Sequence, residues 1–113
     1  MLIPKKSLGQ NFLIDKNIIN KIVNLLKIKN KIIVEIGPGL GQLTQVLLKK
    51  KPKKLIIIEK DEELFLKLCL KFNNEKNIKI INQDILKFDF NKLKNATIVS
   101  NLPYNLSTKI ILK

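Results

Sequence analysis

Four short apolar runs constrain the fold of this chain more than any other feature. They occupy residues 31–36, 55–58, 78–81 and 96–100. In the first two runs most isoleucines, leucines and valines follow one another directly, which is typical of parallel strands buried on both faces. Segments with helical spacing or turn residues separate the runs. Strand–helix–strand repeats pack as a parallel sheet with right-handed crossovers, so the sequence predicts an α/β fold.

Helical periodicity fills the intervals between these runs. Apolar residues recur at helical spacing over 18–26, then at Leu43, Val46 and Leu47, and again in the stripe Leu64, Leu68 and Phe72. Asp15 and Asp61 can cap helices, Ser107 can cap a last one, and 88–94 is a loop or short helix. A doubly wound sheet has the strand order 3-2-1-4, and its ligand site lies where strands 1 and 4 meet at their carboxyl ends.

A glycine loop, Gly37-Pro38-Gly39-Leu40-Gly41, follows the first predicted strand. Glycines at this place let the backbone turn sharply and approach a ligand closely. The dinucleotide pattern requires Gly or Ala at position 42, where this chain has Gln42, and the phosphate-binding P-loop pattern fails as well. The loop therefore suits a nucleoside better than a phosphate group. A plain tight turn is the alternative.

Two acids follow the second and third predicted strands. Glu59 lies 22 positions after Gly37 (59 − 37), where an acid accepts hydrogen bonds from ribose hydroxyls. Its alternative role is that of a solvated acid beside Lys60. Asp84 could accept a hydrogen bond from an adenine amino group, with Ile85 against the ring. A turn or capping aspartate is the alternative for Asp84.

The sharpest motif is Asn101-Leu102-Pro103-Tyr104-Asn105, directly after the fourth strand. An adenine amine is a poor nucleophile because its lone pair is delocalised into the ring. Acceptors aimed at both N–H groups reduce that delocalisation, and the Asn101 side chain and the Leu102 carbonyl can supply them. Pro103 stiffens the turn, and Tyr104 offers a face on which an extruded base stacks. A Pro-Tyr turn that only closes a strand is the alternative.

Composition limits the remaining chemistry. The net charge is +13, and every basic residue is a lysine. This charge indicates a polyanion such as nucleic acid, or else a codon bias that favours Lys, Ile and Asn. With no His and with Cys69 as the lone cysteine, imidazole catalysis, disulfides and multi-cysteine metal sites are excluded. No signal peptide or membrane span is visible, so we expect a cytoplasmic protein.

Three motifs together resemble one known family. Lys6-Ser7-Leu8-Gly9-Gln10-Asn11-Phe12-Leu13, Glu35-Ile36-Gly37-Pro38-Gly39-Leu40-Gly41 and the Asn101–Asn105 motif look like those of the KsgA-type ribosomal RNA adenine dimethyltransferases. The resemblance runs from Lys5 to the last residue, with all three motifs in order at the family spacing. The erythromycin-resistance methylases share the general pattern. The sequence Gly-Gln-Asn-Phe-Leu at residues 9–13 favours the ribosome-assembly enzymes of the family over the resistance methylases.

The resemblance implies S-adenosylmethionine as the methyl donor and two adjacent adenines near the 3′ end of small-subunit ribosomal RNA as acceptors. Its implied partner is the small ribosomal subunit, with no membrane and no metal. The implied catalytic residues are Asn101, Leu102, Pro103 and Tyr104. The implied cofactor-binding residues are Gln10, Asn11, Leu13, Gly37, Gly39, Glu59, Lys60, Asp84, Ile85 and Asn101.

The length departs from the family pattern, whose catalytic domain has further strands and a helical domain after it. We expect residues 1–113 to be the N-terminal part of that domain, with 1–14 a segment covering the cofactor and 15–113 the β/α core. The chain would then end in the helix after strand 4, leaving strand 4 as an exposed edge. A truncated gene product, a fragment, or half of a split enzyme completed by a second chain are the alternatives.

Several functions stay open from the sequence alone. The chain is either an RNA adenine-N6 methyltransferase or a non-catalytic fragment that binds the cofactor or RNA. An erythromycin-resistance-type methylase of large-subunit RNA is a further alternative. A DNA adenine methylase more often has an acid where Asn101 stands, and a dehydrogenase is disfavoured by Gln42.

Overall fold

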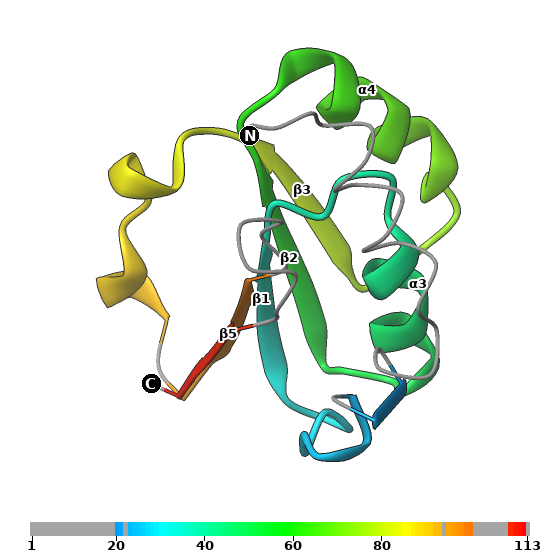
Figure 1. The fold of residues 1–113 in the computed structure, drawn as a ribbon, viewed down its shortest axis with the longest axis vertical. Coiled ribbons are helices and arrows are strands. Elements are labelled where there is room, and N and C mark those ends of the chain that lie inside the picture. The colour runs from blue at the N-terminus through cyan, green and yellow to red at the C-terminus, as the bar shows by residue number, and fades with distance from the viewer. Residues whose placement is uncertain (1–19, 22, 94, 101–108, 113) are drawn as a thin grey trace.

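The computed structural model describes residues 20, 21, 23–93, 95–100 and 109–112, the last four by their backbone (Figure 1). Residues 20, 21, 23 and 24 are helical, and the remaining elements follow in the order β1 (Ile32–Ile36), α3 (Gln42–Lys49), β2 (Lys54–Glu59), α4 (Glu62–Lys71), β3 (Ile78–Asn82), η1 (Ile85–Lys87), η2 (Phe90–Lys92), β4 (Thr97–Ser100) and β5 (Lys109–Leu112). The elements η1 and η2 are short 3-10 helices. The four predicted strands are therefore confirmed.

The strand order is β3-β2-β1-β4-β5, and its first four strands are parallel. The predicted order 3-2-1-4 is thus confirmed. The register aligns the carboxyl ends of these strands: Ile36 pairs with both Ile58 and Ser100, and Glu59 pairs with Asn82. Loops that are far apart in the sequence therefore leave the sheet along one edge, at the top of Figure 1.

Apolar side chains bury both faces of the sheet. The helices α3 and α4 cover one face (Figure 1), where Leu43, Leu47, Leu68 and Phe72 join a buried cluster with the inward residues of β1 and β2. Val46 and Leu64, predicted in the same stripes, are half-buried. On the other face, Val34, Ile56, Ile58, Ala96 and Ile98 form a second cluster, against which residues of η1 and η2 pack. The apolar residues of β1 and β2, which follow one another with little polar interruption, are the sequence signature of this two-sided burial.

The expected helix after strand 4 is wrong for Lys109–Leu112, which forms β5. This strand runs antiparallel to β4, with Ser100 opposite Lys109 and Thr97 opposite Leu112. The expectation that strand 4 is an exposed edge is wrong for the same reason. An unpaired strand edge offers a row of hydrogen-bonding groups, and a short run with two isoleucines suits a strand better than one helical turn. Ser107, the expected cap, lies outside the described residues.

The helix caps follow the sequence where the structure describes them. Asp61 caps α4, since its side chain accepts a hydrogen bond from the Leu64 N–H at 2.9 Å. Glu62 and Glu63 lie in the first turn, at the positive end of the helix dipole. Asp15 lies outside the described residues. Within the described part of the chain, each helix is too short or too polar to cross a membrane.

Candidate functional site

The candidate site lies at the carboxyl edge of the parallel strands. The glycine loop leaves β1 there, Glu59 ends β2, and Asp84 follows β3. Ser100, the last residue of β4, pairs with Ile36 immediately before the loop. Because parallel strands end at one edge, the topology brings together three of the predicted binding elements and the strand that precedes Asn101.

The glycine loop adopts a conformation that side chains disfavour. Gly37, Gly39 and Gly41 have φ angles of 65°, 60° and 86°, in the left-handed region. A Cβ on Gly41 would lie 2.9 Å from Cε2 of Phe72, so the loop packs closely against the end of α4. A Cβ on Gly39 would meet nothing within 4 Å. The loop is therefore fixed from behind by α4 and open at Gly39.

Glu59 is a buried carboxylate, 6% exposed, held by backbone donors. Its Oε2 accepts a hydrogen bond from the Asp61 N–H at 2.9 Å. Burial raises the pKa of Glu59, the backbone bond from Asp61 opposes this rise, and the negative charge of Asp61 adds to it. Backbone bonds from Gly39 and Lys60 also oppose it. A carboxylate has about four acceptor positions, so these donors orient Glu59 and leave capacity for a ligand.

Asn82 is a positioning residue that sequence reasoning missed. Its side-chain amide donates to the backbone carbonyls of Glu59 at 3.0 Å and Lys60 at 3.1 Å. The Gln83 N–H also donates to the Glu59 carbonyl, at 3.1 Å. These bonds fix the end of β2 to the end of β3. No local sequence pattern indicates this role, because it depends on the pairing of β2 with β3, and the paired residues lie more than twenty positions apart in the chain.

Glu35 is a second missed residue, and it lies fully buried one residue before the carboxyl end of β1, the central strand. Thr44, near the start of α3, donates a hydrogen bond to its Oε1, while Oε2 has no hydrogen-bond partner among the described residues. Burial raises the pKa of Glu35 to about 7, the bond from Thr44 opposes this, and the charge of Glu59 adds to it. The sequence feature that could have identified Glu35 is an acid within an apolar strand that leads directly into the glycine loop.

Asp84 caps the short helix η1, which is the alternative role that the sequence allowed for it. Its Oδ1 accepts a hydrogen bond from the Leu86 N–H at 2.9 Å and so caps η1. Ile85 is half-buried and packs against the second apolar cluster. Lys60 has an exposed side chain and contributes its carbonyl to the bond with Asn82. The remaining predicted site residues lie outside the described residues: Gln10, Asn11, Leu13, Asn101, Leu102, Pro103 and Tyr104.

This edge combines an open glycine loop with two buried acids of raised pKa. The charge of Glu59 disfavours ionisation of Glu35, so the pair repels when both groups are ionised. A positively charged group near them would favour the ionised forms. Within the described residues, no group of His, Cys, Asp and Glu side chains has the arrangement of a metal site. The edge thus suits a polar ligand that has hydroxyl donors and positive charge.

Comparison with known proteins identifies the family. The family described as ribosomal RNA adenine dimethylase matches residues 2–113. Ribosomal RNA small subunit methyltransferase A of Pelagibacter ubique (strain HTCC1062) is 53% identical over 111 residues, 96% of this chain and 42% of that protein. Its namesake in Mycoplasmopsis pulmonis (strain UAB CTIP) is 47% identical over 109 residues, with 96% and 42% covered.

A solved structure agrees with the sequence relatives. The crystal structure of a dimethyladenosine transferase from Plasmodium falciparum superposes with a TM-score of 0.62 at 35% identity, covering 82% of this chain and 34% of that one. The chain spans less than half the length of the curated relatives it matches. With a family match over nearly all of its residues, the chain belongs to the ribosomal RNA adenine dimethylase family.

Proposed function

We propose that this chain takes part in the S-adenosylmethionine-dependent N6-dimethylation of two adjacent adenines near the 3′ end of small-subunit ribosomal RNA, in the cytoplasm and during ribosome assembly. One observation carries the proposal: the glycine loop and Glu59 share the sheet edge at which β4 ends, and Asn101-Leu102-Pro103-Tyr104 follows β4 directly. Relatives named for the small subunit favour this substrate over large-subunit RNA.

The residues of the edge fit this cofactor. S-adenosylmethionine carries a positive sulfonium and a ribose, and when bound it supplies an electrophilic methyl group. Its charge suits an edge where burial raises the pKa of both Glu35 and Glu59. Glu59 would accept from the ribose hydroxyls, and the open space at Gly39 admits a ligand close to the backbone.

The remaining cofactor contacts are proposed from the sequence motifs. Gly37 would pack against the methionine portion, with Gln10, Asn11 and Leu13 beside the cofactor. Asp84 and Ile85 would hold the adenine; Asp84 has a second carboxylate oxygen besides the one that caps η1. Lys60, which follows Glu59 directly in the sequence, would also lie beside the cofactor.

The methyl acceptor is activated by orientation, without a charged base. The Asn101 side-chain oxygen and the Leu102 carbonyl would each accept a hydrogen bond from the target amine, which localises the nitrogen lone pair for attack on the methyl carbon. S-adenosylmethionine, when bound, would supply the methyl group, with S-adenosylhomocysteine as the leaving group, and the proton lost from the amine would pass to solvent. Pro103 would keep the acceptors fixed, and Tyr104 would stack on the extruded base.

Asn101→Ala tests the amine-acceptor role. The variant lacks the side-chain acceptor, so methyl transfer to unmethylated small-subunit RNA should fall by roughly 100-fold or more, the usual effect of losing one preorganised hydrogen bond in a transition state. Radiolabelled methyl incorporation measures this. Asn91→Ala, which changes an exposed asparagine in η2, serves as the matched control and should keep full activity. Wild-type turnover by Asn101→Ala would show that the acceptor argument is wrong.

Calorimetry separates the catalytic role from a binding role. The chain is titrated with S-adenosylmethionine, and methyl transfer is followed in the same preparation. Binding together with transfer supports the proposal. Binding without transfer selects a non-catalytic cofactor-binding module, and an absence of binding removes the cofactor from the proposal for this chain.

A further inference from the structure

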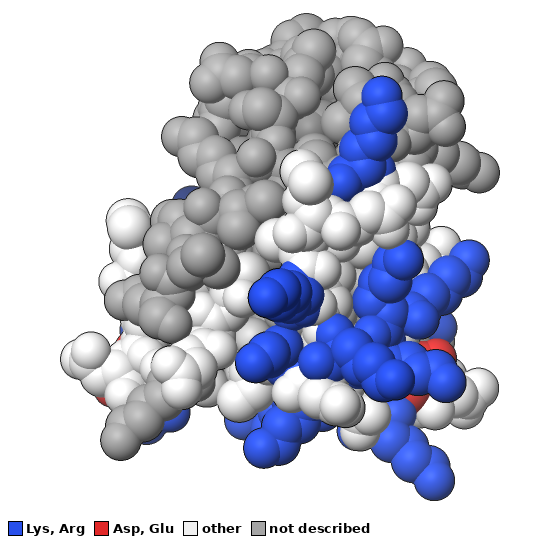
Figure 2. Space-filling model, turned by 90° about the horizontal axis from the view of Figure 1, so that it is seen from below, with Lys and Arg blue, Asp and Glu red and all other residues white. Residues whose placement is uncertain are grey.

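The lysines gather at the end of the sheet opposite to the candidate site. We call this the amino-end surface and define it by segments 27–31, 49–54 and 74–77, which precede β1, β2 and β3. Its exposed lysines are Lys27, Lys29, Lys31, Lys49, Lys50, Lys51, Lys53, Lys54 and Lys76. Glu75 is the acid among the residues of these segments. Figure 2, which looks onto this end of the molecule, shows the lysines in a dense group.

The carboxyl edge has the opposite composition. Segments 37–41, 59–63 and 82–87 contain two lysines, Lys60 and Lys87, beside the acids Glu59, Asp61, Glu62, Glu63 and Asp84. A codon bias toward lysine would act without regard to the end of the sheet at which a residue lies. The contrast between the two ends therefore favours a function for the lysines of the amino-end surface over genome composition.

Backbone hydrogen bonds join the segments of this surface into one platform. The Asn30 N–H donates to the Lys51 carbonyl at 3.1 Å, and the Lys53 N–H donates to the Lys31 carbonyl at 2.8 Å. The Leu55 N–H donates to the Asn77 carbonyl, also at 2.8 Å. The lysines thus extend from a shared backbone framework, and the fold fixes the spacing of their backbone positions.

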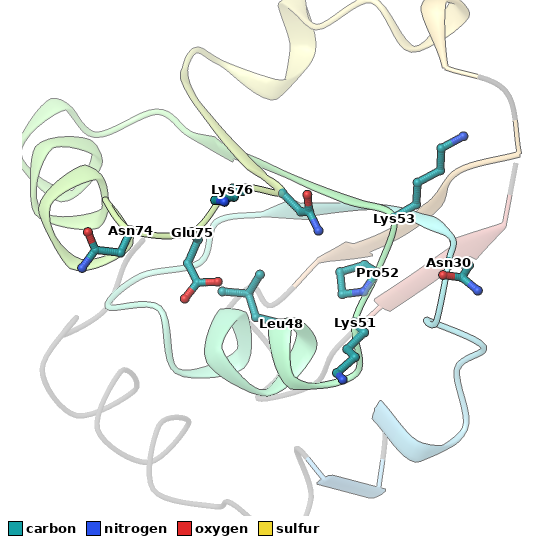
Figure 3. A pocket seen from close by; sticks show the side chains of 9 residues that line it. Asn30, Leu48, Lys51, Pro52, Lys53, Asn74, Glu75 and Lys76 are labelled. Carbon is teal, nitrogen blue, oxygen red and sulfur yellow. The ribbon is translucent and has the colours of Figure 1, made fainter.

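The platform contains a hollow of about 520 Å³. Figure 3 shows its lining from both neighbouring segments: Lys51, Pro52 and Lys53 lie on one side, and Asn74, Glu75 and Lys76 on the other. The lysine ammonium groups around this hollow donate hydrogen bonds, the asparagine side chains both donate and accept, and the Glu75 carboxylate accepts. In Figure 3 the Lys53 side chain extends away from the hollow, where its ammonium group is available to a phosphate on the surface.

The positive charge of this surface is not neutralised within the described residues. The ion pair found among the described residues lies away from this surface, between Lys67 and Glu63 on α4, at 3.9 Å. Crowded like charges repel one another, and a polyanion that binds them releases its own condensed counterions. Lysine, a compact point charge, suits phosphate groups, whereas arginine would be expected where bases are read through bidentate bonds.

We propose that the amino-end surface binds the phosphate backbone of RNA, without regard to base sequence, at the end of the domain remote from the candidate cofactor site. This inference rests on the proposed function in taking RNA as the polyanion. An anionic membrane would be the competing partner. Membrane-surface segments also insert apolar side chains, and the exposed large aliphatic residues Leu25, Leu40, Leu66, Leu70 and Leu86 all lie outside the three segments.

Matched double variants test this surface. Lys53→Gln/Lys76→Gln removes two charges from the amino-end surface, and Lys67→Gln/Lys79→Gln removes two exposed lysines from outside the three segments. Fluorescence anisotropy with a single-stranded small-subunit RNA fragment is measured from 0.1 to 1 M salt. The first pair should flatten the slope of log K against log salt by roughly 1.4 and weaken binding at 0.1 M salt by about 10- to 30-fold. The second pair should leave both unchanged.

Two further measurements make the result decisive. A scrambled RNA of equal length should lose the same affinity, and Lys53→Arg/Lys76→Arg should restore binding because it restores the charge. Equal RNA affinity in the two glutamine variants, or binding of anionic phosphatidylserine vesicles in place of RNA, would overturn the inference. Methyl transfer and cofactor titration, run in parallel, report on the proposed function separately. If RNA binding depended on Lys53 and Lys76 but no methyl transfer occurred, the proposed function would be rejected and this inference would stand.

Discussion

At the scale of single residues, two buried acids govern the chemistry of the carboxyl edge. Glu35 lies under α3 with one oxygen bonded to Thr44, and Glu59 is oriented by backbone donors at the end of β2. An apolar residue at position 35 would pack there without a desolvation penalty. The presence of a buried carboxyl on the strand that leads into the glycine loop is consistent with the proposed binding of a charged ligand at this edge.

Glu35 should make the stability of the protein depend on pH. In the folded protein its pKa is about 7, against an ordinary value of 4.5. Between these values the folded state binds more protons than the unfolded state, so the contribution is fully present below pH 4.5 and is lost as the pH rises through 7. The loss is roughly 3 kcal/mol. Urea unfolding at pH 5 and pH 8 measures it.

Glu35→Gln removes this titration. The variant should lose much less stability than the wild-type protein between pH 5 and pH 8, even if its buried amide lowers stability at both values. Glu75→Gln, at an exposed position, is the matched control and should keep the wild-type pH dependence. An unchanged pH dependence in Glu35→Gln would contradict the assignment.

At the scale of elements, the loop between β2 and α4 connects helix stability to the site. Asp61 caps α4 through its side chain, and its backbone N–H donates to Glu59. The same residue thus ends the strand region, starts the helix and orients the acid that is proposed to bind ribose. Its side chain and its backbone perform separable tasks, which substitution can distinguish.

Asp61→Ala should destabilise the protein by about 1 kcal/mol, because the Leu64 N–H loses its acceptor. The backbone bond to Glu59 should persist, and loss of the nearby charge should lower the pKa of Glu59. Thermal unfolding measures the first effect. Asp61→Asn keeps a capping oxygen and removes the charge, so it should retain most of the stability. If Asp61→Asn lost as much stability as Asp61→Ala, capping would not be the cause.

At the scale of the whole molecule, charge is separated along the strand direction. The carboxyl edge carries most of the acids of the described segments. The amino-end surface carries most of their lysines, which gather on the face shown in Figure 2. If both proposals hold, the acids would attract a cationic cofactor to the carboxyl edge, where the target adenine also has to enter. The lysines would hold a different stretch of the RNA backbone at the opposite end.

Binding of a cationic cofactor should release protons from the carboxyl edge. Burial raises the pKa of Glu35 to about 7, so part of the protein carries a proton on this carboxyl at pH 7. A nearby positive charge lowers this pKa, so binding should release protons. Calorimetry with S-adenosylmethionine at pH 7, in two buffers of different ionisation enthalpy, measures the release. Glu35→Gln should reduce it, and equal enthalpies in both buffers for the wild-type protein would argue against the coupling.

Local patterns in the sequence were enough to predict the parallel strands, their order and the edge at which Gly37, Glu59 and Asp84 meet. Periodicity and strand–helix alternation leave few topologies open, and the order of a doubly wound sheet then places the loops. The sequence also identified the family motifs, including the Asn101–Tyr104 tetrapeptide, whose role remains a prediction.

Other features depend on contacts between distant segments and became visible only in the folded chain. The strand pairing of Lys109–Leu112 with β4, the bonds from Asn82 to Glu59 and Lys60, and the raised pKa of Glu35 all arise from neighbours that no local window contains. The same holds for the lysines, whose number is visible in the composition but whose gathering at one end requires the loops to be placed. Burial and charge density are properties of the packed chain, and only folding brings the relevant groups close enough to interact.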